Sequence, residues 1–350
     1  MSFEKARALF PVLERKAYLN AGTFGPLARP TLDAIEREQR SELEHGRFGK
    51  DYFERMLALR VEVRAALAAL VGAATEQVAL TASTTDGCNI VLAGLGLSSE
   101  DEIVTTNEEH FGLLGPLHAS GARIVVVASE PDAILAAITP RTRLLALSHV
   151  LWTTGRVLPV HELRERTGIP ILVDGAQSVG AIPVHSPGLD FLTISGQKWL
   201  CGPDSSGALV VAEPERLRVA RPSYFSQSSH EPSGRFEPQE GAARFDPNWL
   251  APSVLAGLAA ALDLAPEGRF ERAAEQARRC RERLAAHADI VPGRATLVSF
   301  RADDPPDLVA RLAEQDVIVR DLPGTGLVRA SCGWWTSDAD VERLVAGVAS

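Results

Sequence analysis

The sequence predicts an α/β fold in which helices cover both faces of a mostly parallel central sheet and a smaller α+β domain follows. Two observations lead to this prediction. Short apolar runs alternate with helical stretches as far as about Pro214, and this alternation is typical of a parallel sheet buried between helices. Beyond Pro214 the alternation stops, and a second pattern with longer helical segments begins.

Six apolar runs in the first part are expected to be buried strands, because each is short, rich in Val, Ile and Leu, and bounded by turn or polar residues. In chain order they are Gln77–Leu80, Glu102–Thr106, Arg123–Ala128, Leu144–Ser148, Ile171–Val173 and Phe191–Ile194. The helical stretches expected between them are Asp86–Ala93, Pro131–Ile138 and Val160–Thr167. Ligands bind beyond the carboxyl ends of the strands in such sheets, so polar residues after the strands are the candidates for a site.

The second part begins with the segment 222–252, which is rich in Ser, Pro, Gly, Glu and aromatic residues and has little periodicity. We expect it to be a long functional loop rather than a flexible linker. The elements expected after it are a helix-rich stretch Ser253–Ala286, strands Ala295–Phe300 and Val317–Arg320, and a closing helix Ser337–Val348 with Ser337 as its N-cap.

Three parts of the chain follow from these patterns. Residues 1–20 are expected to pack with the small domain, residues 21–249 to form the large domain, and residues 250–350 to form the small one. The fold class is therefore α/β with an appended α+β domain.

Composition excludes several classes of protein. The formal net charge of −9 argues against a nucleic-acid partner or an anionic membrane surface. The N-terminus mixes charges from the start, unlike a signal peptide, and the longest apolar run, around Ser253–Leu264, is too short to span a bilayer. The four cysteines show no C-x-x-C pair. We therefore expect no metal site, and reduced thiols in a cytoplasmic protein.

Three polar groups follow the ends of predicted strands. Asp174 comes directly after Ile171–Val173, and Lys198 comes shortly after Phe191–Ile194. The residues Ser83-Thr84-Thr85 stand where a helix begins, and hydroxyl groups at a helix N-terminus favour anion binding. Each residue alone is more often a solvated lysine, a turn former or a helix cap. Together they meet the needs of pyridoxal phosphate (PLP), which requires a lysine for its aldehyde, an acid for its ring nitrogen and a cradle for its phosphate.

At this point the sequence resembles a known family. Its strongest blocks are Val173–Ser178 (VDGAQS), Ser195–Trp199 (SGQKW) and Ser83–Asn89 (STTDGCN), within a likeness that runs from Tyr18 to Ser331. The chain is similar to the class V aminotransferases and cysteine desulfurases among the fold-type I PLP enzymes. This resemblance implies that PLP is the cofactor, that the fold is that of a fold-type I PLP-dependent transferase, and that the large domain binds PLP.

The resemblance also implies roles for individual residues. Lys198 would form the Schiff base with the cofactor and shuttle the substrate's α-proton. The residues expected to act on the cofactor are Asp174 at the pyridinium, Gln177 at the ring's 3-oxygen, Thr84, Thr85, Ser195 and Gln197 at the phosphate, and His110 stacked on the ring. Arg329 would bind the substrate carboxylate, since a guanidinium can bind both carboxylate oxygens at once.

The sequence departs from the desulfurases in a way that bears on the reaction. These enzymes carry a catalytic cysteine just before the substrate arginine, whereas the segment Arg320–Leu327 has none and Cys332 follows Arg329. Trp152 stands where many relatives have asparagine, and Asn248-Trp249 stands where many have a glycine–threonine pair. All five tryptophans lie in or beside site motifs, so we expect an aromatic-walled pocket in which Trp152 and Trp249 bind substrate, Trp249 coming from a second subunit.

This pattern most resembles the L-cysteine/cystine carbon–sulfur lyases. The function expected is β-elimination on a cysteine- or cystine-like amino acid, giving pyruvate, ammonia and a sulfur species, with Lys198 and His110 in the catalytic machinery and a homodimer as the assembly. An aminotransferase is the first alternative, and a desulfurase or an epimerase comes next. A PLP-binding protein without catalysis is the alternative from a different class.

Overall fold

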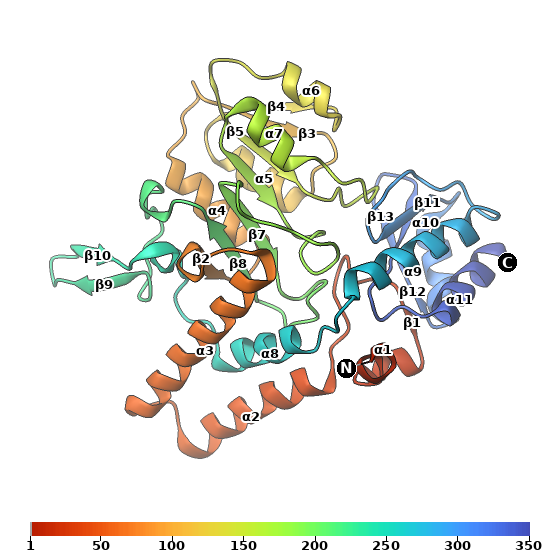
Figure 1. Ribbon diagram of the computed structural model, residues 1–350, viewed down its shortest axis with the longest axis horizontal. Helices are drawn as coiled ribbons and strands as arrows, with labels where there is room; N and C mark the ends of the chain where they lie inside the picture. The colour runs from red at the N-terminus through yellow and green to blue at the C-terminus, as the bar shows by residue number, and fades with distance from the viewer. Residues whose placement is uncertain (1) are drawn as a thin grey trace.

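A seven-stranded sheet forms the centre of the larger part of the molecule (Figure 1). The computed structural model describes residues 2–350. The strands lie in the order β2-β8-β7-β6-β5-β3-β4, and only β8 runs antiparallel to its neighbours. Their bounds are β2 (Val78–Thr81), β3 (Glu102–Thr106), β4 (Arg123–Val127), β5 (Thr142–Ser148), β6 (Ile171–Asp174), β7 (Phe191–Ser195) and β8 (Gly207–Val211). The expected fold class is confirmed.

Helices bury both faces of this sheet. Neighbouring residues of one strand point to opposite faces, so Leu145 and Leu147 of β5 join one core cluster and Leu144 and Ala146 join the other. The first cluster includes side chains from α3 (Gly49–Val71), α6 (Pro131–Ala136), α7 (Val160–Thr167) and α8 (Pro252–Asp263). The second includes side chains from α4 (Thr84–Leu95) and α5 (Phe111–Ala119).

The smaller part is built on an antiparallel sheet in the order β11-β14-β13, with β11 (Leu297–Arg301), β14 (Leu327–Ser331) and β13 (Arg320–Leu322). Its helices are α9 (Arg269–Leu284), α10 (Pro305–Glu314) and α11 (Asp338–Ala349). Ser337 caps α11 as expected, since its Oγ accepts a hydrogen bond from the backbone N–H of Asp340 at 3.2 Å. None of the described helices is long and apolar enough to cross a membrane.

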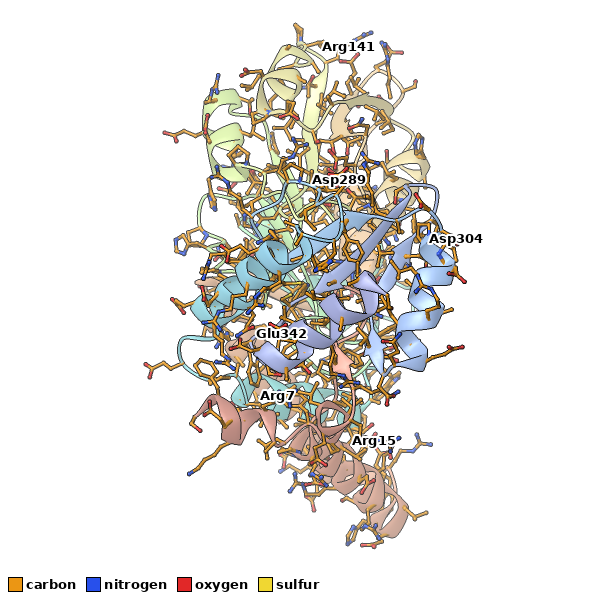
Figure 2. All side chains as sticks on the ribbon, turned by 90° about the vertical axis from the view of Figure 1, so that its right-hand side faces the viewer. Arg7, Arg15, Arg141, Asp289, Asp304 and Glu342 are labelled. Atoms are coloured by element: carbon orange, nitrogen blue, oxygen red, sulfur yellow. The ribbon has the colours of Figure 1, made fainter. Side chains whose placement is uncertain are left out.

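The N-terminal segment contacts the smaller part. It contains α1 (Phe3–Arg7), the short helix η1 (Pro11–Glu14) and β1 (Ala17–Tyr18), and β1 pairs in parallel with β12 (Val317–Ile318). Arg7 donates to both carboxylate oxygens of Asp340 in α11, and Figure 2 shows Arg7 and Arg15 beside this part.

The helix α8 was expected in the smaller domain, but it packs on α2 (Arg29–His45) and α3. Leu255 and Leu258 of α8 belong to the core of the larger part. We therefore propose that the boundary between the two domains lies after α8 rather than at residue 250.

Several elements differ from the prediction. The strands β8 and β14 were not predicted from the sequence. The strand expected at Val317–Arg320 divides at Val319 into β12 and β13, which pair with different strands. The segment 222–252 is not wholly a loop. It contains the hairpin β9 (Gln227–His230) and β10 (Phe236–Pro238), which projects from the body in Figure 1, and the short helix η4 (Gly241–Phe245). The remaining 3-10 helices are η2 (Thr75–Gln77) and η3 (Pro214–Arg216).

Candidate active site

A cavity of about 270 Å³ lies at the carboxyl ends of β6 and β7, where the two parts of the molecule meet. Ten of the eleven residues expected in the site line it: Thr84, Thr85, His110, Trp152, Asp174, Gln177, Ser195, Gln197, Lys198 and Arg329. Trp249 does not line it. Parallel strands end at the same edge of a sheet, and this shared edge is why residues distant in sequence converge here.

The N-terminus of α4 forms one wall. Ser83 caps the helix by accepting a hydrogen bond from the N–H of Asp86 at 3.1 Å, and Thr84 and Thr85 form its first turn at the cavity. The first N–H groups of a helix lack intrahelical partners and attract anions. On β7 and just beyond it, Ser195 Oγ donates to Gln197 Oε1 at 2.7 Å and so orients that amide. This wall presents neutral donors that suit a phosphate group.

Two buried carboxyl groups belong to this region: Asp174, which lines the cavity, and Glu109, which precedes the lining residue His110. Asp174, at the end of β6, accepts a hydrogen bond from the N–H of Ala176 at 2.8 Å. Burial raises the pKa of Asp174, while nearby Lys198 opposes that shift. Glu109, which the sequence analysis did not single out, accepts from the N–H of Ser148 at 2.9 Å and also from a threonine hydroxyl. Burial raises the pKa of Glu109 to about 7, and the negative charge of Asp174 adds to the shift.

Two hydrogen bonds fix the orientation of the side-chain amide of Gln177. Its Nε2 donates to the carbonyl of Gly22 at 2.8 Å, and its Oε1 accepts from Trp199 Nε1 at 3.0 Å. Trp199 is buried and positions Gln177 from behind. Aromatic rings line the cavity as expected, namely Phe24, His110, Phe111 and Trp152, but Trp152 alone of the five tryptophans is among the described residues that line it. Trp334 and Trp335 instead pack with Phe10 in the core.

Lys198 follows β7 and lines the cavity. Burial lowers the pKa of Lys198 to about 8; Asp174 opposes this shift, and Arg329 and Arg320 add to it. Much of this amine is thus neutral near pH 8, which is the form that attacks an aldehyde or accepts a proton.

His110 begins α5, and its Nδ1 accepts a hydrogen bond from the N–H of Gly112 at 3.0 Å. Burial lowers the pKa of His110 to about 4, with Lys198 the next cause, so the ring is a neutral imidazole at physiological pH. Its ring lies edge-on to Trp152, with the centroids 5.0 Å apart. A neutral imidazole fixed by this hydrogen bond and this ring contact is suited to stacking on a flat cofactor ring rather than to acid–base chemistry.

Two arginines enter the cavity from the small sheet. Arg329 on β14 is buried, and its Nη1 donates to the carbonyl of Trp152 at 2.8 Å. Burial lowers the pKa of Arg329 to about 9, and the charge of Arg320 adds to the shift. Arg320 on β13 also lines the cavity. No role for Arg320 was predicted from the sequence, because no local pattern marks it as a site residue.

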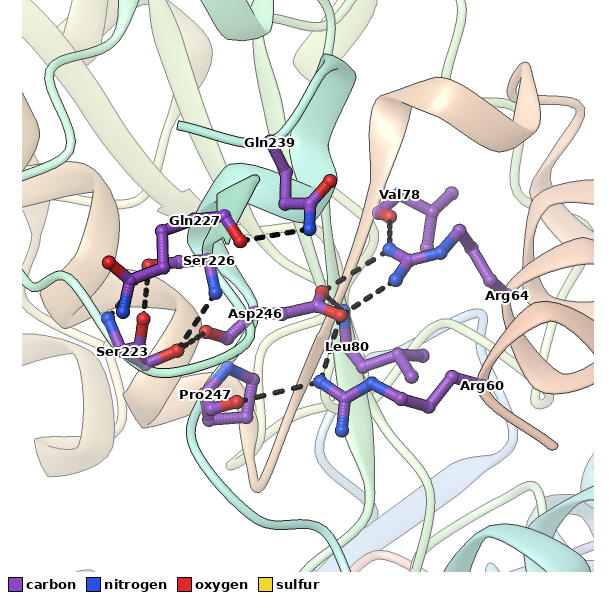
Figure 3. A network of polar contacts seen from close by, with 10 residues as sticks. All are labelled: Arg60, Arg64, Val78, Leu80, Ser223, Ser226, Gln227, Gln239, Asp246 and Pro247. Atoms are coloured by element: carbon purple, nitrogen blue, oxygen red, sulfur yellow. Dashed lines mark hydrogen bonds and ion pairs between the residues drawn. The ribbon is translucent and has the colours of Figure 1, made fainter. Parts of the chain in front are cut away.

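Trp249 lies on the surface of this chain. Half of its surface is exposed, and it packs with Tyr224, Phe225 and Phe53 at ring-centroid distances of 6.1, 4.9 and 5.9 Å. An ion-pair network anchors the backbone nearby (Figure 3). In that network the buried Asp246 accepts from Arg60 at 2.9 Å, from Arg64 at 2.7 Å and from the N–H of Leu80 at 2.9 Å. The network holds the aromatic surface in place.

These groups fit PLP on the geometry alone. Among the described residues that line the cavity, Lys198 is the only lysine and Asp174 is the only acid, and the start of α4 supplies neutral donors for a phosphate. Gly112 helps to keep the helix termini close together, because a Cβ there would lie 2.8 Å from Thr85 Oγ1. A buried acid that would face the ring nitrogen, a lysine of lowered pKa for the aldehyde and neutral donors for the phosphate are the groups that a PLP-dependent enzyme requires.

Comparisons with known proteins agree. The family model described as Aminotransferase class-V matches residues 19–344, and the chain belongs to that family. An isopenicillin N epimerase from Amycolatopsis lactamdurans is 31% identical over 93% of this chain and 92% of its own length. A probable cysteine desulfurase from Halalkalibacterium halodurans is 26% identical over 99% and 97%.

Among solved structures, the cystine C–S lyase C-DES in complex with its reaction product cysteine persulfide is 29% identical, with a TM-score of 0.90 and coverage of 97% of this chain and 99% of that one. A C-DES variant with glycine covalently linked to the PLP cofactor is 28% identical, with a TM-score of 0.91 over 98% and 99%. The expected family, the likeness to C–S lyases and the cofactor, pyridoxal 5'-phosphate, are confirmed.

Proposed function

We propose that this enzyme is a PLP-dependent carbon–sulfur lyase that acts by β-elimination on cysteine- or cystine-like amino acids. The observation that carries the proposal is the segment between Arg320 and Arg329. It contains no cysteine, and no cysteine is among the described residues that line the cavity. A desulfurase needs a thiol there to accept sulfur, whereas a lyase releases sulfur from the substrate directly. The likeness to the cystine C–S lyase C-DES supports this choice.

The overall reaction is balanced without an oxidant or reductant. A substrate R–S–CH2–CH(NH3⁺)–COO⁻ and one water give R–SH, pyruvate and ammonium. Bound PLP supplies an electron sink that stabilises negative charge at the α-carbon. Lys198 Nζ removes the α-proton, and the thiolate leaves from the β-carbon. The released aminoacrylate then hydrolyses in water.

The other residues hold the reacting groups in place. Asp174 keeps a proton on the ring nitrogen, because an opposite charge favours the protonated form. Thr84, Thr85, Ser195 and Gln197 would bind the phosphate, and Gln177 would bind the ring oxygen. His110 would lie against the ring as a neutral imidazole. Arg329 binds the α-carboxylate of the substrate. Its Nε and Nη2 are buried and have no hydrogen-bond partner among the described residues, so both can donate to that carboxylate.

We also propose that the protein acts as a homodimer in which Trp249 completes the partner's site. The exposed rings of Tyr224, Trp249 and Phe53 lie together, and the exposed Phe48 stands just before α3, the helix that carries Phe53. Clustered exposed aromatic residues mark protein interfaces. The four unpaired, buried cysteines favour a cytoplasmic location, where thiols stay reduced.

An epimerase is the second candidate, because an isopenicillin N epimerase is 31% identical over nearly the whole chain. An aminotransferase remains the alternative that the family's description suggests. Products separate all of these functions. Cysteine, cystine or an S-substituted cysteine incubated without a keto acid gives pyruvate and ammonia with a lyase. Cysteine gives alanine with a desulfurase, and an epimerase gives the D-amino acid. A new amino acid that appears only when a keto acid is added indicates an aminotransferase.

The same assay on a cysteine-free variant tests the observation that carries the proposal. Replacing all four cysteines should leave pyruvate formation within about tenfold of the parent in the folded fraction, since core substitutions cost stability but no thiol takes part. The positions to replace are Cys88, Cys201, Cys280 and Cys332. Alanine as the main product, abolished in this variant, would contradict the lyase proposal.

A further inference from the structure

The Trp152 loop (residues 150–157) contacts both parts of the molecule. It follows β5 and is closed on itself, because the N–H of Leu151 donates to the carbonyl of Arg156 at 2.9 Å. The N–H of Gly155 in turn donates to the carbonyl of Leu151 at 2.9 Å. Trp152 itself lines the cavity. The loop is therefore a compact unit, and its position fixes that of Trp152.

The smaller part holds this loop by its backbone carbonyls. Arg329 Nη1 donates to the carbonyl of Trp152 at 2.8 Å. Ser299 Oγ, on β11, donates to the carbonyl of Thr153. The two backbones also pack closely, because a Cβ on Gly155 would lie 2.7 Å from a backbone oxygen of β11. These contacts join the Trp152 loop to the small sheet.

The larger part holds the same loop through Glu108, which stands in the turn between β3 and α5, two residues before His110. Its Oε2 accepts a hydrogen bond from Thr153 Oγ1 at 3.0 Å. Its Oε1 accepts from Arg156 Nη2 at 2.9 Å and also from the hydroxyl of Ser129. Hydrogen bonds to an ionised group are about twice as strong as those between neutral groups. Thr153 is thus held from both sides, with its hydroxyl bound to the larger part and its carbonyl to the smaller.

We propose that Glu108 is a positioning residue for substrate binding: through Thr153 it holds the small sheet at the distance from the cofactor-binding wall at which an amino acid can bind. Glu108 is not among the described residues that line the cavity, so it acts through the Trp152 loop and touches neither cofactor nor substrate. The inference rests on the proposed function for the role of the small sheet in binding the amino acid. The competing account is that Glu108 contributes only to the stability of the fold.

The two accounts differ in which ligand is affected. The residues expected to bind PLP all belong to the larger part, whereas an amino acid is bound by both parts. The apparent affinity of a ligand falls with the fraction of the protein that is in the binding-competent arrangement. One charge-assisted hydrogen bond corresponds to about 10- to 100-fold in an equilibrium constant, and the loop keeps its other contacts. Loss of the Glu108 carboxylate should therefore raise the Kd of an amino acid about tenfold and leave the Kd of PLP within about threefold.

Three variants and a matched control locate the effect. E108A removes both contacts of the carboxylate, and T153V keeps the shape of threonine but removes its hydroxyl donor. If Glu108 acts through Thr153, the double variant E108A/T153V should bind an amino acid about as weakly as E108A alone, because the two changes break the same link. E130A is the control, since the exposed Glu130 pairs with Arg156 at 2.5 Å and makes no hydrogen bond to Thr153. It should bind like the parent.

The binding measurements need no turnover. Calorimetric titration of the holoenzyme gives the Kd of L-alanine and of glycine, which carry no leaving group on the β-carbon. Equilibrium dialysis of the apoprotein gives the Kd of PLP, and melting temperatures check that each variant folds. With an S-substituted cysteine as substrate, E108A and T153V should raise KM about tenfold and leave kcat within about threefold.

The outcomes are distinguishable from failure of the lyase proposal. Weaker binding of L-alanine or glycine in E108A and T153V, with PLP binding unchanged, supports the inference even if no S-substituted cysteine yields pyruvate, and only the lyase proposal then fails. Unchanged amino-acid binding in T153V overturns the inference, also if E108A does not fold. So does a double variant whose effects multiply, or a loss of PLP and amino-acid affinity in equal measure. A parent that binds neither amino acid overturns the inference together with the role of the small sheet.

Discussion

Asp174→Asn tests the electrostatic core of the site. Asn has the shape of Asp and can still accept the hydrogen bond that Asp174 Oδ1 takes from the N–H of Ala176 at 2.8 Å, so packing is retained and the negative charge is lost. In the holoenzyme Asp174 would form a buried ion pair with the protonated ring nitrogen of PLP. Removing one partner of such a pair costs about 3–5 kcal/mol. At about 1.4 kcal/mol per decade of rate, turnover should fall roughly 10²- to 10⁴-fold.

The assay is the first-order rate of product formation with saturating substrate, on holoenzyme whose PLP content is measured. Burial raises the pKa of Asp174, which means that the ionised carboxylate is unfavourable in the folded apoprotein at neutral pH. The apoprotein of the Asn variant should therefore melt no lower than the parent. Asp190→Asn is the control, since Asp190 pairs with Arg164 away from the cavity and a partly exposed pair contributes little. A near-native rate for Asp174→Asn would refute the role of Asp174.

Three further outcomes are expected. Because burial lowers the pKa of Lys198 to about 8, the rate of PLP incorporation into apoprotein should rise with pH through 8 and then level off; a rate independent of pH between 6.5 and 9 would count against the neutral amine as nucleophile. Trp249→Ala should lose activity that returns on mixing with Lys198→Ala subunits, because a hybrid dimer restores one complete site; no recovery in verified hybrid dimers would place Trp249 outside the partner's site. Asp246→Ala should lower the free energy of unfolding by about 3–5 kcal/mol, since it leaves Arg60 and Arg64 buried without their counter-charge; a loss under 1 kcal/mol in denaturant unfolding would contradict this.

The part of the site that could be predicted from the sequence consists of polar residues that directly follow predicted strands. Asp174 and Lys198 come after apolar runs that their alternation with helical stretches predicts to be buried strands, and parallel strands bring their carboxyl ends together. The capping hydroxyls before α4 are a local signal of a helix start, and the structure places Ser83 there. In each case the pattern that predicts the strand or helix also indicates that the residue lies at the carboxyl-end edge of the sheet.

The residues that were missed depend on pairings that lie outside any local pattern. Arg320 reaches the cavity because β13 pairs with β14, and two strands of three and five residues leave little periodicity to detect. Trp199 follows Lys198 directly, yet it points behind Gln177, because nearness in sequence does not fix direction beyond the strand. Glu109 precedes His110, and its burial could have been inferred only from the polar groups that surround it.

The strand β8 was missed for a different reason. Gly207–Val211 is a run of five apolar residues, and a run of that length does not distinguish a strand from a buried helical turn. Its antiparallel direction also departs from the alternation on which the fold class was predicted. The fold class is unaffected, because one antiparallel strand within a large parallel sheet is common.

The central claim is that Lys198 carries the cofactor, and the chain allows a direct test because it has only four lysines, at positions 5, 16, 50 and 198. Borohydride reduction of the yellow holoenzyme, followed by digestion and mass spectrometry, should place the pyridoxyl phosphate adduct on the peptide that contains Lys198, and Lys198→Ala should yield no adduct. An adduct on any of the other three lysines, or none in protein that contains stoichiometric PLP, would contradict the account.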